Sequence, residues 1–124
     1  MPSLTSIVEI STRALAGVTP HTLTAKQLNS SLQALKEVDI HEAIDEYWTD
    51  LPSKPEVESE IIAWKKLMHD KGKELSHQVN VLNHELSRIK EMHAALGLEQ
   101  LDDLIHLAQK IIRPLYNFTS QLTY

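Results

Sequence analysis

Residues 61–96 read IIAWKKLMHDKGKELSHQVNVLNHELSRIKEMHAAL, and the spacing of apolar side chains in this stretch decides the fold. One apolar series recurs every seven positions and consists of Ile61, Met68, Leu75, Leu82, Ile89 and Leu96. A second series lies three or four residues from the first and contains Val57, Trp64, Gly72, Val79, Leu86 and His93, with Met92 beside His93. Together the two series predict the apolar seam of a long amphipathic helix that packs as helices do in a coiled coil.

Gly72 lies in the middle of this seam, where a turn would divide the segment into two helices. The next three residues are Lys73, Glu74 and Leu75, and none of them is of a type that usually caps a helix N-terminus. A glycine inside a helix costs only about 1 kcal/mol, which several buried leucines outweigh. We therefore predict one continuous helix over residues 54–96.

The two ends of the long helix carry separate signals. Pro52 and Pro55 interrupt the preceding helix, so residues 51–56 are expected to form a linker. Ser53 followed by Glu56 matches a capping box and places the helix start near residue 54. Gly97 predicts the C-terminal end, because glycine readily takes the left-handed conformation that closes many helices.

Further helices are predicted on both sides of the long one. Apolar residues at helical spacing indicate a first helix that ends near Gly17, and capping patterns at Thr24 and Asp39 begin a second helix and a short third one. Residues 99–122 carry a wide apolar face and are expected to return antiparallel along the long helix.

The expected fold class is all-α, an elongated, coiled-coil-like helical bundle. Its length of 124 residues suits a single domain. Within it we expect N-terminal helices in residues 1–50, the proline linker, and a long helical hairpin over residues 57–124.

The length of the predicted long helix has a functional implication. Residues 54–96 would span about 60 Å as a helix, whereas a compact chain of this size is roughly 35 Å across. Part of the seam must therefore be covered by helices lying lengthwise, by a second copy, or by another protein. The short N-terminal helices are expected not to reach Leu75, Leu82 and Ile89, so these three are predicted interface residues.

Composition restricts the setting in which the chain works. It contains no cysteine, which excludes disulfides and thiolate ligands and fits a reducing compartment. Glu9 and Arg13 interrupt the N-terminal apolar residues, so no signal peptide is expected. No apolar stretch approaches the roughly 20 residues that a membrane span needs. We expect an intracellular protein, cytoplasmic or nuclear.

Charge is distributed unevenly along the chain. The net charge is −5, but residues 37–60 contain nine acidic residues and one lysine and carry −8, which leaves +3 elsewhere. A nucleic-acid-binding protein usually presents a continuous basic surface, and no such pattern emerges here. We therefore expect no nucleic-acid partner.

Seven histidines raise the question of a metal site. Glu74 with His77, and Asp103 with His106, have the carboxylate-x-x-histidine spacing found in di-metal helical bundles. A helical wheel turns both pairs away from the apolar faces of their helices, toward water. No metal or other cofactor is therefore predicted.

Catalytic motifs are also missing from the sequence. It contains no cysteine nucleophile, no G-x-S-x-G turn and no glycine-rich phosphate loop. We expect a protein that is not an enzyme, and no small-molecule substrate is inferred.

Trp48 and Trp64 flank the proline linker and allow two interpretations. They pack together and set the angle between the third and the long helix, or one of them is an exposed anchor for a partner. Both are therefore included among the candidate interface residues.

The function predicted from the sequence is protein–protein interaction. The chain would act as a scaffold, adaptor or assembly subunit that presents a helical seam to a second copy or to a partner's helix. The alternative is a small acidic chaperone or inhibitor that masks a partner protein.

Overall fold

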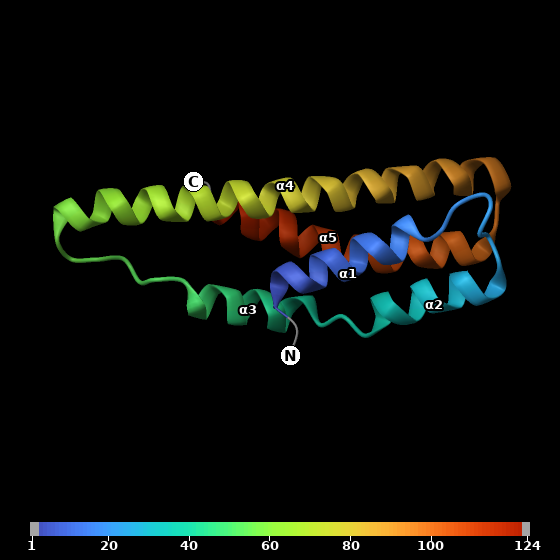
Figure 1. Ribbon diagram of the computed structural model, residues 1–124, viewed down its shortest axis with the longest axis horizontal. Coiled ribbons are helices and arrows are strands. Elements are labelled where there is room, and N and C mark those ends of the chain that lie inside the picture. Colours follow the sequence, from blue (N-terminus) through green and yellow to red (C-terminus); the bar gives the residue numbers. More distant parts are fainter. Residues whose placement is uncertain (1–2, 123–124) are drawn as a thin grey trace.

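The computed structural model describes residues 3–122, which form five α-helices (Figure 1). In chain order they are α1 (Leu4–Ala16), α2 (Ala25–Lys36), α3 (Ile40–Asp50), α4 (Glu58–Leu96) and α5 (Glu99–Leu122). There is no strand in this described part of the chain, and the all-α prediction is confirmed.

Helix α4 runs without interruption through Gly72, as predicted, and its 39 residues span about 58 Å. It begins at Glu58 rather than near residue 54, and the predicted capping box at Ser53 is wrong. Val57 occupies the N-cap position without a side-chain hydrogen bond. The physical reason is Pro55, which disfavours the helical conformation of the preceding residue and keeps this part of the linker out of the helix.

The other predicted helix ends are confirmed. The side chain of Thr24 accepts a hydrogen bond from the backbone N–H of Gln27, and that of Asp39 accepts one from the N–H of Glu42. Each bond satisfies a donor that the first turn of a helix otherwise leaves unpaired. Gly97 closes α4 with a φ of 66°, the left-handed conformation expected of it.

The helices pack lengthwise around one apolar core (Figure 1). α5 lies antiparallel along α4 and forms the predicted hairpin with it. α1 packs on α4 and on α2, α2 packs on α5, and α3 packs on α1 and α5. Among residues 3–122, no helix combines the length and the apolar character needed to cross a membrane.

The bundle is elongated because α4 is longer than the helices packed against it. Its N-terminal end projects beyond α3 and beyond the end of α5, with only the linker beside it (Figure 1). The accessible surface of the chain is 7862 Å², whereas a compact protein of 14.1 kDa exposes about 6,700 Å². The shape thus leaves part of α4 outside the shared core.

Candidate protein-binding surface

Three of the predicted interface residues lie in the core instead of on the surface. Leu75, Leu82 and Ile89 are 2%, 1% and 0% exposed. The expectation that they remain uncovered is wrong, because α1 and α5 both lie along this part of α4. The seam from Gly72 to Met92 is therefore closed within the chain, whereas Leu96 at its end is exposed.

Exposed apolar side chains gather at the opposite, N-terminal end of α4, with Val81 and Leu96 exposed singly further along the helix. No residue of α4 before Met68 is buried. The exposed apolar side chains in this region are Trp48, Val57, Ile62 and Leu67, to which Ile61 and Trp64 add half-buried surface. We call these six residues the tip surface. Trp48 is 53% exposed and Ile62 71% exposed, large values for side chains of this size and character.

The tip surface extends around the helix and does not form a single stripe. Ile62 and Leu67 are five residues apart, so they project about 140° from one another around the axis of α4. Neither belongs to the heptad seam, and sequence reasoning based on the seam did not select them. Their position outside the seam, in the first turns of a helix too long for its domain, was the signal that could have identified them.

The two tryptophans are held in different ways. Trp64 donates a hydrogen bond from Nε1 to the carbonyl oxygen of Pro52 at 2.7 Å, which fastens the linker to α4. Trp48 lies edge-on to the ring of Phe118, with a centroid separation of 6.0 Å, and Tyr47 contacts the same ring at 5.6 Å. Both ring pairs found in residues 3–122 thus involve Phe118, and neither joins the two indoles. Trp48 therefore keeps half of its surface free.

A pocket of about 450 Å³ lies between the two tryptophans. Its apolar wall consists of Trp48, Leu51, Pro52, Trp64 and Met68. Thr49, Ser53 and Lys54 add polar groups to its lining. The pocket is formed where α3, the linker and α4 meet, so the bond between Trp64 and Pro52 helps to define its shape.

The segment that contributes most of the pocket lining carries a net negative charge, although the one charged residue in the lining is Lys54. The charged residues of segment 45–66 are Asp45, Glu46, Asp50, Glu56, Glu58 and Glu60 against Lys54, Lys65 and Lys66. All nine are exposed, and together they carry a net charge of −3.

Two groups of α3 have raised pKa values, chiefly because of burial and secondarily because of nearby carboxylates. Burial raises the pKa of the Tyr47 hydroxyl, and the carboxylate of Glu74 raises it further. Partial burial raises the pKa of Glu42, and the neighbouring charges of Asp39 and Glu46 add to the effect. In both cases nearby negative charge opposes the formation of another anion.

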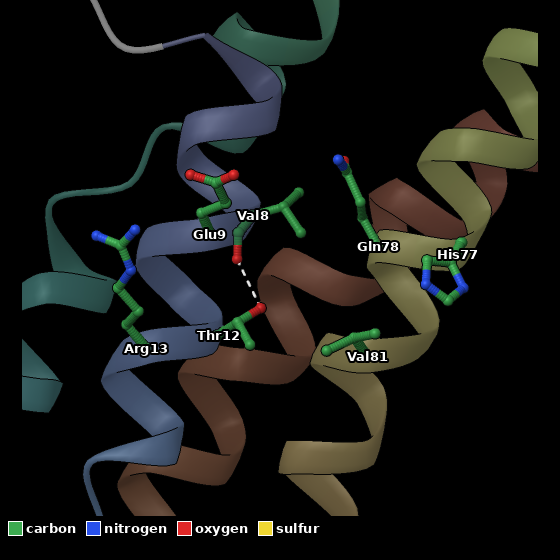
Figure 2. A pocket seen from close by; sticks show the side chains of 7 residues that line it. All are labelled: Val8, Glu9, Thr12, Arg13, His77, Gln78 and Val81. Atoms are coloured by element: carbon green, nitrogen blue, oxygen red, sulfur yellow. Dashed lines mark hydrogen bonds between the residues drawn. The ribbon is translucent and has the colours of Figure 1, made fainter.

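A second hollow of about 310 Å³ lies between α1 and α4 (Figure 2). Val8 points toward the gap from α1, and Gln78 and Val81 line its α4 side, while Arg13 and His77 point away from it. The hydroxyl of Thr12, also in its lining, donates to the carbonyl oxygen of Val8 at 2.7 Å. These side chains present a small apolar contact area, and none of them places a base beside a free hydroxyl.

The two carboxylate–histidine pairs face outward, as their positions on the helical wheel predicted. Glu74, His77, Asp103 and His106 are all exposed. His106 interacts with Asp102 and not with Asp103: its Nδ1 lies 2.8 Å from the carbonyl oxygen and 3.6 Å from Oδ2 of Asp102. No group of three or more potential metal ligands occurs within residues 3–122. The fold therefore does not bring the two pairs together.

Three further histidines lie on α4. His69 and His84 are exposed on the polar side of α4, as is His77. His93, nearer the seam, is half-buried. None of these positions belongs to the tip surface or lines its pocket.

Comparisons with models of protein families, with curated proteins and with solved structures find nothing that matches this chain.

Proposed function

We propose that this chain is a non-enzymatic protein-binding module, a scaffold, adaptor or assembly subunit, that engages its partner through the tip surface. The observation that carries the proposal is the concentration of exposed apolar side chains around one projecting helix end, with Trp48 and Ile62 the most prominent. Covering one such side chain contributes about 1.5–3 kcal/mol. Apolar patches of this kind mark interaction sites in soluble proteins, and tryptophan is enriched among the residues that dominate binding energy.

The rigidity of the tip supports the same proposal. The pocket wall is formed by helix residues and by a linker that is hydrogen-bonded to Trp64. A surface held in place before binding loses less conformational entropy when a partner arrives. The short N-terminal helices leave this end of α4 accessible, while α1 and α5 pack along α4 where its seam is buried from Met68 to Met92.

Site-specific photocrosslinking tests the proposal. A photoreactive phenylalanine analogue replaces Ile62 in one variant and Ala95 in another, both exposed on α4 but close to opposite ends. In cells that naturally make this protein, we expect position 62 to form a discrete covalent adduct with a partner and position 95 to form none. Adducts of equal yield at both positions, or at neither, would refute a binding role for the tip.

The mass of the adduct distinguishes the forms that the proposal can take. An adduct of twice the chain mass identifies a second copy, and any other mass identifies a different protein. The acidic segment beside the pocket also suits a chaperone or inhibitor that masks its partner. Such a protein should be found both free and bound in size-exclusion chromatography of the cell extract, whereas an assembly subunit should elute only in the complex.

A further inference from the structure

We infer that the partner segment recognised by the tip surface is a basic amphipathic helix that inserts one large apolar side chain into the pocket between Trp48 and Trp64. This inference rests on the proposed function and adds the chemistry of the partner. It combines three features of the tip: the size of its pocket, the charge around that pocket, and the length of helix left uncovered.

The pocket is suited to an apolar anchor. Its volume of about 450 Å³ falls within the range of ligand-binding sites, and Trp48, Trp64 and Met68 are among the residues that line it. Trp64 uses its only side-chain donor on Pro52, so its ring offers an apolar face and no free polar group. An aromatic or branched aliphatic side chain matches this lining better than a polar one.

The charge around the pocket favours a basic partner. Asp45, Glu46 and Asp50 lie on α3 or at its end, and further carboxylates follow at the start of α4. They outnumber Lys54 in the pocket lining and Lys65 and Lys66 on α4, which leaves segment 45–66 with a net charge of −3. Lysine or arginine residues flanking the apolar anchor would meet these carboxylates, which speeds association and selects the partner. An anionic membrane surface would be repelled by the same charges.

The charge also argues against a second copy as the occupant. A two-fold dimer places the same surface of each subunit against itself. Segment 45–66 carries a net charge of −3, so such a dimer would bring two negative surfaces together. Like charges across an interface oppose association.

The uncovered part of α4 fits a helical ligand. Residues 58–67 precede the first buried position and span about 15 Å, close to three turns. A helix laid beside these turns can contact the half-buried Ile61 and Trp64 while its anchor occupies the pocket. This arrangement corresponds to the binding of an amphipathic helix in an apolar groove.

Intrinsic fluorescence provides a direct test, because both tryptophans of the chain line the pocket. The probes are two synthetic peptides of about four helical turns. They share the same leucines and one phenylalanine and contain no tryptophan. Their polar positions are all lysine in one peptide and all glutamate in the other. We expect the lysine peptide to shift the emission saturably and to bind about tenfold or more tightly than the glutamate peptide, with added salt weakening it.

Variants locate the binding. Trp48→Ala should weaken the lysine peptide about tenfold or more, with Trp64 still reporting, whereas Leu96→Ala, an exposed apolar change at the other end of α4, should leave it unchanged. A second pair of variants avoids any loss of packing on Phe118. Glu46→Gln combined with Asp50→Asn should weaken binding of the lysine peptide. Glu9→Gln combined with Glu91→Gln removes two exposed carboxylates from α1 and from the C-terminal part of α4, outside the pocket lining, and should have a smaller effect.

Three outcomes would overturn the inference. They are equal binding of both peptides, lysine-peptide binding that none of the tip variants weakens, or a dimer in sedimentation equilibrium that Trp48→Ala dissociates. Whichever of these outcomes occurs, photocrosslinking at position 62 still tests the proposed function independently. An adduct at position 62 without lysine-peptide binding would refute the basic partner and retain the binding module, and peptide binding without an adduct would refute the module.

Discussion

Replacing Arg88 with methionine should loosen α1 from α4. Arg88 on α4 forms a hydrogen bond with Leu15 on α1, which lies 73 positions earlier in the chain. Its Nη2 donates to the carbonyl oxygen of Leu15 at 2.7 Å, near the C-terminal end of α1, and its Nε lies 2.9 Å from Oε2 of Glu85. A cation placed on the last carbonyls of a helix completes their hydrogen bonding and interacts favourably with the helix dipole. Methionine preserves much of the apolar stem and removes only the charged donors.

The expected loss in free energy of unfolding depends on the hydrogen bond that is removed and on the Leu15 carbonyl that loses it. A hydrogen bond to a charged group contributes roughly 1.5–3 kcal/mol. The Leu15 carbonyl still accepts a bond from the backbone N–H of Val18 at 3.1 Å, so the substitution does not leave a buried acceptor unpaired. The cost should therefore fall at the lower end, about 1.5–2 kcal/mol, which corresponds to a fall in Tm of roughly 4–10 °C for a chain of this size.

Urea unfolding followed by far-ultraviolet circular dichroism measures this change. Lys90→Met is the matched control, since Lys90 is exposed on the same helix, and its free energy of unfolding should stay within about 0.5 kcal/mol of the parent. Arg88→Lys should lie between the two, because lysine keeps the charge but not the forked geometry. If Arg88→Met loses no more stability than Lys90→Met, the bond to Leu15 does not hold α1 in place.

The remaining predictions concern stability and its dependence on pH. Leu82→Ala should lower the free energy of unfolding by about 2–5 kcal/mol in chemical denaturation, since Leu82 is fully buried, and a loss under 1 kcal/mol would contradict its place in the core. Ser11→Ala should be neutral or stabilising by up to about 1 kcal/mol in a thermal melt, because the buried Ser11 hydroxyl has no hydrogen-bond partner within residues 3–122; a clear loss would mean that it is bonded. Gly97→Ala should cost about 1–2 kcal/mol in urea unfolding from its positive φ alone, as nothing lies within 4 Å of an added Cβ, and an unchanged midpoint would argue against the left-handed cap. Because the folded pKa of Tyr47 is raised, its contribution to stability is present below pH 10 and is lost as pH rises through that pKa; ultraviolet titration should show the pKa falling in Glu74→Gln, and no change would exclude Glu74 as a cause.

The helices could be predicted from local patterns alone. Helical spacing of apolar residues and the caps at Thr24, Asp39 and Gly97 act within a few residues of one another, so the sequence contains the whole interaction. The start of α4 was misplaced because the capping pattern at Ser53 competes with Pro55. The restriction that proline places on the preceding residue prevailed.

The candidate site could be predicted only in part. Trp48 and Trp64 were selected from their position beside the linker, and both line the pocket. Leu75, Leu82 and Ile89 were assigned to an open interface, yet they are core residues. A heptad pattern shows that a helix face will be covered, but intramolecular and intermolecular coverage produce the same pattern.

The sequence by itself determined that the chain is all-α, that its longest helix is continuous through Gly72, and that this helix outgrows a compact domain. These properties depend on short-range periodicity and on helix length, which are readable along the chain. The tertiary structure alone decided which part of the seam stays uncovered. That choice depends on where α1 and α5 lie along α4, and contacts such as the one between Arg88 and Leu15 join segments too distant in sequence to be paired by spacing. The burial of the seam beyond Gly72 and the exposure of the tip surface are consequences of that packing.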